Sequence, residues 1–378
     1  MSRIRSRRRT RSRRARRAGV LAVLVLARPG AAQQADPAPR EIRIDPDRAV
    51  QLYVSNDPAD HDLGRDHERD RRMKAWTDSI FRIAAPGRYA FRKISYRSRV
   101  GDLDIPAYVY EPLEKRGPRG HAALIWVHGG VHADWSVGTL PFVTEAVERG
   151  YVVIAPEYRG STGYGPEHYN AIDYGGHEID DVITAYDWLV ENLPHVDPER
   201  VAIMGWSHGG FIAAHAVFRE EHPFRAAVAI VPVTNLIFRL SYKGPYYQWA
   251  FSTQERIRGL PFERPELYVE RSPVYHVDKL EVPILVHLAT NDDDVDFVEA
   301  EMLVHALQVK KPHLAETKIY VDPPGGHSFS RLVDPRTLER TDTPEQRDSW
   351  NRTWNFLEWN LRPYEDRSLA NGEAARTP

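Results

Sequence analysis

Short, unbroken apolar runs recur through the last two thirds of the chain. They occupy residues 122–127, 151–155, 201–204, 226–231, 284–288 and 318–321. A run without polar alternation is typical of a strand that is covered on both faces. An earlier stretch alternates instead, with apolar side chains at Leu103, Ile105, Ala107 and Val109. That alternation predicts a half-buried strand after a turn at residues 101–102.

Helical patterns lie between several of these runs. Apolar residues repeat with a period near 3.6 over residues 179–190, and again over residues 350–361. Alternating strands and helices predict an α/β fold with a mainly parallel central sheet and helices on both faces. No repeat of 20–50 residues is visible, so the sequence does not encode a propeller or a solenoid.

Charge is distributed unevenly along the chain. The 378 residues carry a net charge of −2, but residues 1–32 contain 11 arginines and no acidic residue. The remaining residues hold 40 basic and 53 acidic side chains, a net charge of −13. An acidic body repels nucleic acid, so we expect no nucleic-acid partner. The absence of cysteine excludes disulfides and cysteine nucleophiles.

The basic amino-terminal segment has the layout of an export signal. Residues 3–17 are rich in arginine, residues 18–27 are apolar, and residues 30–32 are small. We therefore expect a signal peptide over 1–32 and an exported protein, periplasmic or secreted, through the Sec or the twin-arginine route. Ten apolar residues are too few for a spanning helix, so no stable membrane anchor is expected once the signal is removed. The alternative is a basic arm that binds RNA or lipid.

Three further regions follow from the pattern: a polar, helical extension over 33–85, a catalytic domain over 86–365 and a disordered tail over 366–378. Two histidines, His61 and His67, stand among acidic residues in the extension, but their spacing matches no standard metal site. A solvated helical face explains this segment, and it leads into the apolar residues Met73, Trp76, Ile80 and Phe81.

The sharpest chemical signal is Gly-Trp-Ser-His-Gly at residues 205–209. A strand run ends at Met204 and a helical pattern begins at Phe211, which is the setting of a nucleophile elbow. In such a turn Ser207 projects from the end of the strand, and the flanking glycines keep Cβ atoms out of the corner. The alternative is an ordinary strand-to-helix turn with a capping serine.

A serine hydroxyl needs a base, and the base needs an orienting carboxylate. His327 stands in a Pro/Gly-rich loop directly after the last strand run, where it can reach the sheet edge. Four aspartates at 292, 293, 294 and 296 follow the run 284–288. The order Ser, Asp, His is that of α/β-hydrolases. We expect one of these acids to serve the histidine and the others to cap the following helix.

The transition state also requires hydrogen-bond donors for an oxyanion. His128-Gly129-Gly130 closes the run 122–127, and its glycines allow backbone N–H groups to approach a substrate. We expect the N–H groups of Gly130 and His208 to form the oxyanion hole, and a plain glycine turn is the alternative. This chemistry needs no cofactor and no metal.

These motifs resemble the catalytic domain of the prolyl oligopeptidase family of serine peptidases over residues 123–363. The matching pieces include Tyr158-Arg159-Gly160-Ser161-Thr162-Gly163-Tyr164-Gly165 and the serine, aspartate and histidine segments above. The resemblance selects Asp292, three residues before Val295, as the catalytic acid. It implies an α/β-hydrolase fold and a triad of Ser207, Asp292 and His327.

The sequence also departs from that family. Residues 33–85 leave no room for the β-propeller that many members place before the catalytic domain, so their substrate restrictions do not transfer. We expect cleavage of a small peptide or amide substrate, with carboxylesterase activity and a non-catalytic binding protein as alternatives. Aromatic side chains expected to line the substrate pocket are Trp206, Tyr164, Tyr247 and Trp249. A small packed cap is the alternative for the last two.

Overall fold

The computed structural model describes residues 65–367. The expected signal peptide, residues 33–64 of the expected extension and residues 368–378 of the expected tail lie outside the described residues. Within the described part, no helix is both long and apolar enough to cross a membrane.

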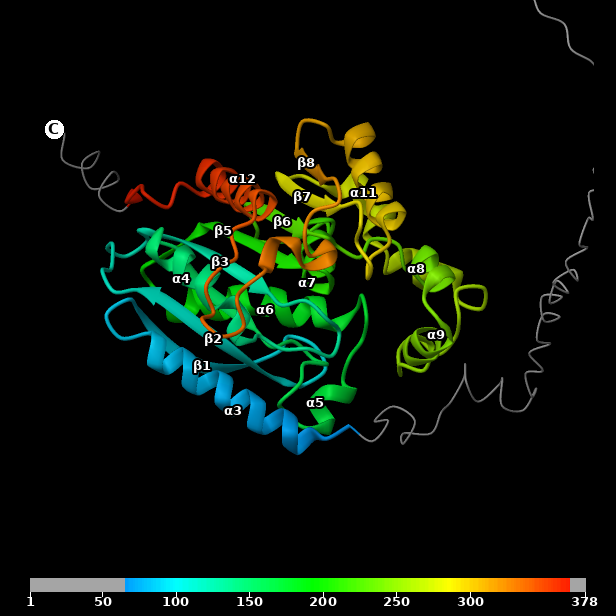
Figure 1. Cartoon of the computed structure of the whole chain (residues 1–378), viewed down its shortest axis with the longest axis horizontal. Helices are drawn as coiled ribbons and strands as arrows, with labels where there is room; N and C mark the ends of the chain where they lie inside the picture. The colour runs from blue at the N-terminus through cyan, green and yellow to red at the C-terminus, as the bar shows by residue number, and fades with distance from the viewer. Residues whose placement is uncertain (1–64, 368–378) are drawn as a thin grey trace, which may run out of the picture. The chain divides into compact units, whose positions relative to one another are not determined.

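Eight strands form one sheet in the order β1-β2-β4-β3-β5-β6-β7-β8 (Figure 1). Their bounds are β1 (Tyr89–Arg97), β2 (Asp104–Pro112), β3 (His121–Val127), β4 (Val152–Pro156), β5 (Val196–Trp206), β6 (Ala226–Ile230), β7 (Ile284–Ala289) and β8 (Ala315–Tyr320). The strand β2 pairs antiparallel with both β1 and β4, and the pairs from β4 to β8 are parallel. Every apolar run of the sequence falls on a strand, which confirms the mainly parallel sheet.

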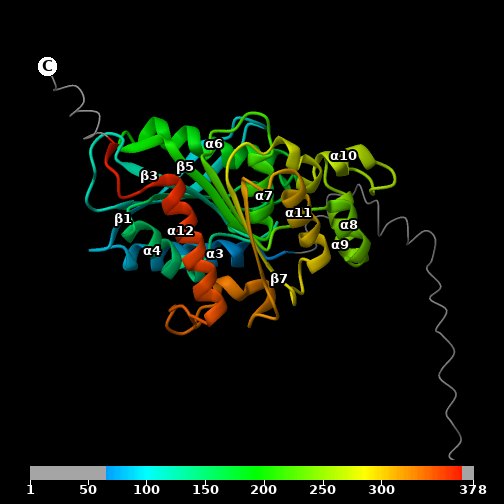
Figure 2. The same ribbon diagram turned by 90° about the horizontal axis from the view of Figure 1, so that it is seen from above.

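Helices cover both faces of the sheet, as expected (Figure 2). One face carries α6 (His177–Asn192), α7 (His208–Val217) and α11 (Phe297–Lys310), and the other carries α3 (His67–Ala84), α4 (Leu140–Glu148) and α12 (Pro344–Leu361). All seven residues of β3 and all five of β4 are buried. Burial on both faces explains why these strands read as continuous apolar runs.

The helix α12 packs through the periodic residues seen in the sequence. Trp350, Trp354 and Leu357 are all at most 1% exposed. The ring of Trp350 stacks on Phe142 of α4 at 4.9 Å between centroids. It also lies 5.7 Å from the ring of Trp206, the last residue of β5. This aromatic layer therefore supports the strand end that carries Ser207.

The orientation of α3 differs from the expectation. Phe81 is buried, but Met73 is 52% and Trp76 is 48% exposed. The helix instead buries Lys74 and Thr77 against the body of the protein. An ion pair between Lys74 and Glu157 explains this, because a charged side chain can be buried when it is paired.

Short elements connect the larger ones at the carboxyl edge of the sheet. Between β6 and β7 lie α8 (Leu236–Tyr242), α9 (Pro245–Ser252), α10 (Pro265–Glu270) and the 3₁₀ turn η2 (Pro273–Lys279). The remaining short elements are η1 (Val137–Thr139), α5 (Pro166–Asn170) and η3 (Gly326–Arg331). The histidine expected to act as the base lies in η3, directly after β8.

Candidate active site

Ser207 occupies a strained turn between β5 and α7. Its backbone has φ 54° and ψ −119°, a conformation that an L-residue rarely adopts and that costs about 1–3 kcal/mol. The flanking glycines make the turn possible. A Cβ on Gly205 would lie 2.5 Å from the carbonyl carbon of Gly209, and a Cβ on Gly209 would lie 2.3 Å from the Val127 oxygen. The sequence therefore folds here as the expected nucleophile elbow.

His327 and Asp292 meet at the carboxyl ends of β7 and β8. The Nδ1 atom of His327 lies 2.8 Å from Asp292 Oδ2 and hydrogen-bonds to it. The other carboxylate oxygen accepts hydrogen bonds from the backbone N–H groups of Asp294 at 3.0 Å and Val295 at 2.8 Å. These bonds fix the carboxylate and leave Nε2 of the imidazole facing away from Asp292.

The structure brings the histidine turn to the serine turn through their neighbours. The indole of Trp206 donates a hydrogen bond of 2.7 Å to Ser330 Oγ. Trp206 directly precedes Ser207, and Ser330 lies three residues after His327. Among the described residues, no hydrogen bond links the Ser207 hydroxyl to the imidazole. Such bonds often tighten only when substrate binds.

A second aspartate faces the other nitrogen of the imidazole. Asp294 Oδ2 lies 3.7 Å from His327 Nε2. Lys243 of the α8–α9 segment pairs with Asp294 at 2.6 Å, and Arg239 approaches it to 3.5 Å. Burial would raise the pKa of Asp294, but these cations hold it below its usual value. The expectation that Asp294 caps a helix is therefore wrong, whereas Asp296 does cap α11.

One expected oxyanion donor, His208, directly follows the serine, and the other, Gly130, directly follows a glycine that approaches it. The N–H of His208 stands at the first position of α7 and bonds to no described residue. Gly129 approaches the nucleophile closely, because a Cβ placed on it would lie 3.3 Å from Ser207 Cβ. Gly130 has φ 80°, and its carbonyl accepts a 2.6 Å hydrogen bond from the Tyr158 hydroxyl. Its N–H bonds to no described residue, so it is available to an oxyanion.

The side chain of His208 has no part in proton transfer. It is 2% exposed, neither ring nitrogen has a hydrogen-bond partner among the described residues, and burial lowers its pKa to about 3. The ring packs against Tyr174 and Phe211. Glu178 Oε1 lies 3.6 Å from Nε2, and burial raises the pKa of that carboxyl to about 8. Only the backbone N–H of His208 is therefore available to the site.

A buried charge network fixes the segment that follows the glycine turn. Lys74 pairs with Glu157 and with Asp134, the latter at 2.5 Å, and donates to the Trp135 carbonyl at 3.0 Å. The N–H of Trp135 donates to Glu157 in return. Burial raises the pKa of Glu157 to about 7 despite Lys74. No local sequence pattern indicates this network, since its members are far apart along the chain.

The aromatic residues expected to line the substrate pocket are dispersed. Trp206 does line a cavity beside the serine. Tyr164 does not belong to the site: it packs on His168, and the ammonium of Lys93 lies 4.9 Å from its ring. The glycines on both sides of Tyr164 have φ 94° and 93°, and the Tyr164 ring faces Lys74 of α3 and Lys93 of β1 instead.

The other two aromatic candidates belong to the packed segment between β6 and β7. The Tyr247 hydroxyl accepts a 2.9 Å hydrogen bond from Arg239 Nε, and it lies 3.5 Å from the Tyr174 hydroxyl. Trp249 is 7% exposed within α9. This arrangement corresponds to the small packed cap. Over residues 65–367, no group of three His, Asp or Glu side chains has the geometry to hold a metal ion.

The sheet order, the elbow and the His–Asp pair define an α/β-hydrolase of the serine type. The model of the prolyl oligopeptidase family matches residues 138–342. The chain therefore belongs to the prolyl oligopeptidase family, as the sequence motifs had predicted.

Curated relatives share the same region. The uncharacterized peptidase YuxL of Bacillus subtilis is 31% identical over 296 residues, which cover 77% of this chain and 42% of that protein. Dipeptidyl aminopeptidase BIII of Pseudoxanthomonas mexicana is 32% identical over 55% of this chain and 30% of its own length. The chain thus covers less than half of the length of these relatives.

Solved structures share the fold. Pyrococcus horikoshii acylaminoacyl peptidase superposes with a TM-score of 0.61 at 20% identity, over 77% of this chain and 44% of that one. A Mycobacterium tuberculosis puromycin-hydrolyzing peptidase has a TM-score of 0.61 at 25% identity, over 73% and 40% of the two chains. These likenesses support the α/β-hydrolase fold.

Proposed function

We propose that this protein is a serine peptidase that cleaves peptide or amide bonds through an acyl-enzyme. One observation carries the proposal: an imidazole fixed by a carboxylate at 2.8 Å, on the same sheet edge as a serine in a strained strand-to-helix turn. Family membership is consistent with it. Ser207 is the nucleophile, His327 the general base and acid, and Asp292 the orienting carboxylate.

Acylation begins when the Ser207 hydroxyl attacks the substrate carbonyl and its proton passes to His327 Nε2. Asp292 accepts the Nδ1–H bond and stabilises the imidazolium. The N–H groups of Gly130 and His208 receive the oxyanion, and the amino end of α7 adds favourable electrostatics. The C–N bond then breaks, and Nε2 returns its proton to the leaving amine.

Deacylation repeats these steps with water as the nucleophile. His327 takes a proton from water, the hydroxide attacks the acyl carbonyl, and the Ser207 oxygen leaves with the proton. The products are a carboxylic acid and the free enzyme. The same machinery cleaves esters, since an alcohol leaves more readily than an amine.

Turnover of matched substrates tests this proposal. The named activities of the relatives suggest peptide anilides with either a free or an acylated amino terminus, each paired with the corresponding ester. We expect amide turnover that falls by at least about 10³-fold in Ser207→Ala and in His327→Ala. Ester turnover with no measurable amide turnover would identify an esterase instead.

Location is a separate proposal. We propose export through the arginine-rich segment at residues 1–32, followed by its removal. Amino-terminal sequencing of protein recovered outside the cytoplasm should show cleavage near Ala32. A protein retained in the cytoplasm with residues 1–32 intact would refute export.

A further inference from the structure

A cavity of about 320 Å³ lies next to the serine turn, because Trp206 and Gly129 line it. One wall comes from the β3–α4 segment, including His128, Gly129 and Ser136, and the opposite wall comes from Ser328 and Arg331 of η3. Trp206, the residue before the nucleophile, also lines it. Its walls therefore include the glycine turn after β3, the residue before Ser207 and the residue after His327, so it adjoins the serine and histidine turns.

Arg331 carries a charge into this cavity that no described residue neutralises. Its guanidinium makes no hydrogen bond, ion pair or ring contact within residues 65–367. Burial lowers the pKa of Arg331, and only the more distant charges of Asp292 and Asp294 oppose that effect. An arginine remains protonated even so. A partly desolvated cation without a partner is costly, and an incoming anion would relieve that cost.

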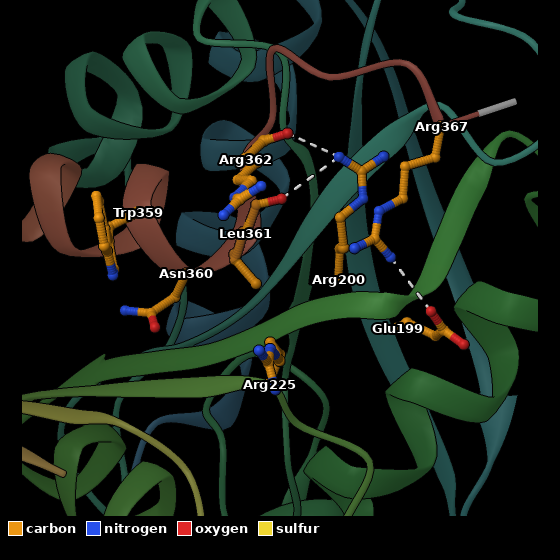
Figure 3. A pocket seen from close by; sticks show the side chains of 8 residues that line it. All are labelled: Glu199, Arg200, Arg225, Trp359, Asn360, Leu361, Arg362 and Arg367. Atoms are coloured by element: carbon orange, nitrogen blue, oxygen red, sulfur yellow. Dashed lines mark hydrogen bonds and ion pairs between the residues drawn. The ribbon is translucent and has the colours of Figure 1, made fainter. Parts of the chain in front are cut away.

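Several other buried or clustered arginines of the protein do have such partners. At the amino ends of β5 and β6, a separate cavity is lined by several arginines (Figure 3). There Arg200 donates to the Arg362 carbonyl at 2.7 Å, and Arg367 pairs with Glu199 at 3.2 Å. Arg331 differs from Arg200 and Arg367 because nothing described competes for its donors.

The guanidinium and the nucleophile face the same position. A carbon placed as Cβ on Gly129 would lie 3.3 Å from Ser207 Cβ and 3.6 Å from Arg331 Nη1. A substrate bound at Ser207 therefore lies within reach of Arg331. A guanidinium fork suits a carboxylate, which it can bind through two parallel hydrogen bonds.

The other residues that line the cavity are compatible with an anionic ligand. Asp134 also lines the cavity, but Lys74 pairs with it at 2.5 Å, so its carboxylate already has a cationic partner. The hydroxyls of Ser136 and Ser328 are further donors in the wall. Arg331 is thus a charged group in the lining without an ion-pair partner among the described residues.

We propose that Arg331 binds a carboxylate of the substrate beside the scissile bond and gives the enzyme a preference for acidic substrates. This proposal rests on the proposed peptidase function and assigns its substrate class. The carboxylate has two possible sources: an Asp or Glu side chain, or the free carboxyl terminus of a short peptide.

Quenched fluorescent peptides distinguish these sources. One series exchanges Glu for Gln at each position around the cleaved bond, and the other compares a free carboxyl terminus with its amide. We expect wild-type enzyme to prefer one acidic member, and Arg331→Met to raise the KM for that member by about 10- to 100-fold. The neutral member should change little in kcat or KM, and Arg331→Lys should restore part of the preference.

Arg336→Met is the matched control, since Arg336 is on the following loop with 88% of its side chain exposed. This variant should have the wild-type kcat and KM on the peptides of both series. The melting temperature of Arg331→Met should also be no lower than that of wild type, because the guanidinium makes no hydrogen bond or ion pair that the substitution removes. An equal loss on acidic and neutral substrates, or an early unfolding transition, would assign Arg331 a structural role and overturn the proposal.

Calorimetric titration with glutarate and with glutaramide tests the anion site without catalysis. Wild type should bind glutarate at least tenfold more tightly than Arg331→Met does, and glutaramide should show no such difference. Equal glutarate affinity in both proteins would refute the site. If the wild type cleaves these peptides without preferring an acidic one, the carboxylate site at Arg331 is refuted and the peptidase function still stands. If it binds glutarate but cleaves nothing, the peptidase function fails.

Discussion

Replacing Lys74 with methionine removes the ion pairs and the hydrogen bond that link α3 to the segment after the glycine turn. Methionine fills nearly the same volume but carries no charge, so Glu157 and Asp134 lose the cation that pairs with them. The hydrogen bond to the Trp135 carbonyl is lost as well. The carboxyl of Glu157 is fully buried, which makes it the group that suffers most.

Removing one partner of a buried pair typically costs about 3–5 kcal/mol. For a protein of this size, such a loss lowers the melting temperature by roughly 5–15 °C. We also expect kcat to fall more than KM rises, because a short segment joins Trp135 to the glycine turn that we propose as the oxyanion site. The double variant Lys74→Met/Glu157→Gln should recover part of the stability, since it removes the unpaired carboxyl.

Denaturant unfolding and steady-state kinetics measure these effects. Arg72→Met is the matched control on the same helix, because Arg72 is 63% exposed and 3.7 Å from Glu68. An exposed pair of this kind contributes about 0–1 kcal/mol. If Lys74→Met unfolds at the same denaturant concentration as Arg72→Met, the buried network does not stabilise α3 as described.

Three further predictions concern the site and its surroundings. Gly209→Ala should abolish turnover, because its Cβ would lie 2.3 Å from the Val127 oxygen and would displace the elbow; a folded, fully active variant would refute the account of the turn. Asp292→Asn should lower kcat by about 10⁴-fold with little change in KM, and a loss below about tenfold would remove Asp292 from the mechanism. Burial lowers the pKa values of His128, His208 and His287 from 6.5 to about 3. The unfolding free energy should therefore fall as the pH drops below 6.5, since the unfolded chain takes up protons on these three histidines that the native state excludes. Glu157 and Glu178, whose pKa values burial raises to about 7 and about 8, offset part of this loss, because the native state binds their two protons first. A flat profile from pH 7 to 4.5 would contradict the net loss.

Local chemistry explains which features were predictable from the sequence. A strand buried on both faces must be apolar throughout, so β3, β4 and β6 were visible as runs. The turn at Ser207 requires glycines at 205 and 209 for steric reasons that operate within a few residues. The assignment of Asp292 required the family resemblance, because the residues alone left four acids open.

Features that depend on distant partners were not predictable. The burial of Lys74, rather than Met73 and Trp76, depends on Glu157, which lies 83 residues further along the chain. The position of Asp294 depends on Lys243, and its contact with the imidazole does not follow from a capping pattern. Arg331 was missed because an arginine after a histidine loop carries no signal until the opposite wall of the cavity is known.

Covalent labelling of Ser207 tests the central claim most directly. Wild-type protein treated with a fluorophosphonate and analysed by intact and peptide mass spectrometry should carry one adduct, located on Ser207. The labelling rate should fall steeply in His327→Ala, since that variant lacks the base that activates the hydroxyl. A folded protein with no adduct, or one labelled on Ser207 at the same rate without His327, would contradict the mechanism.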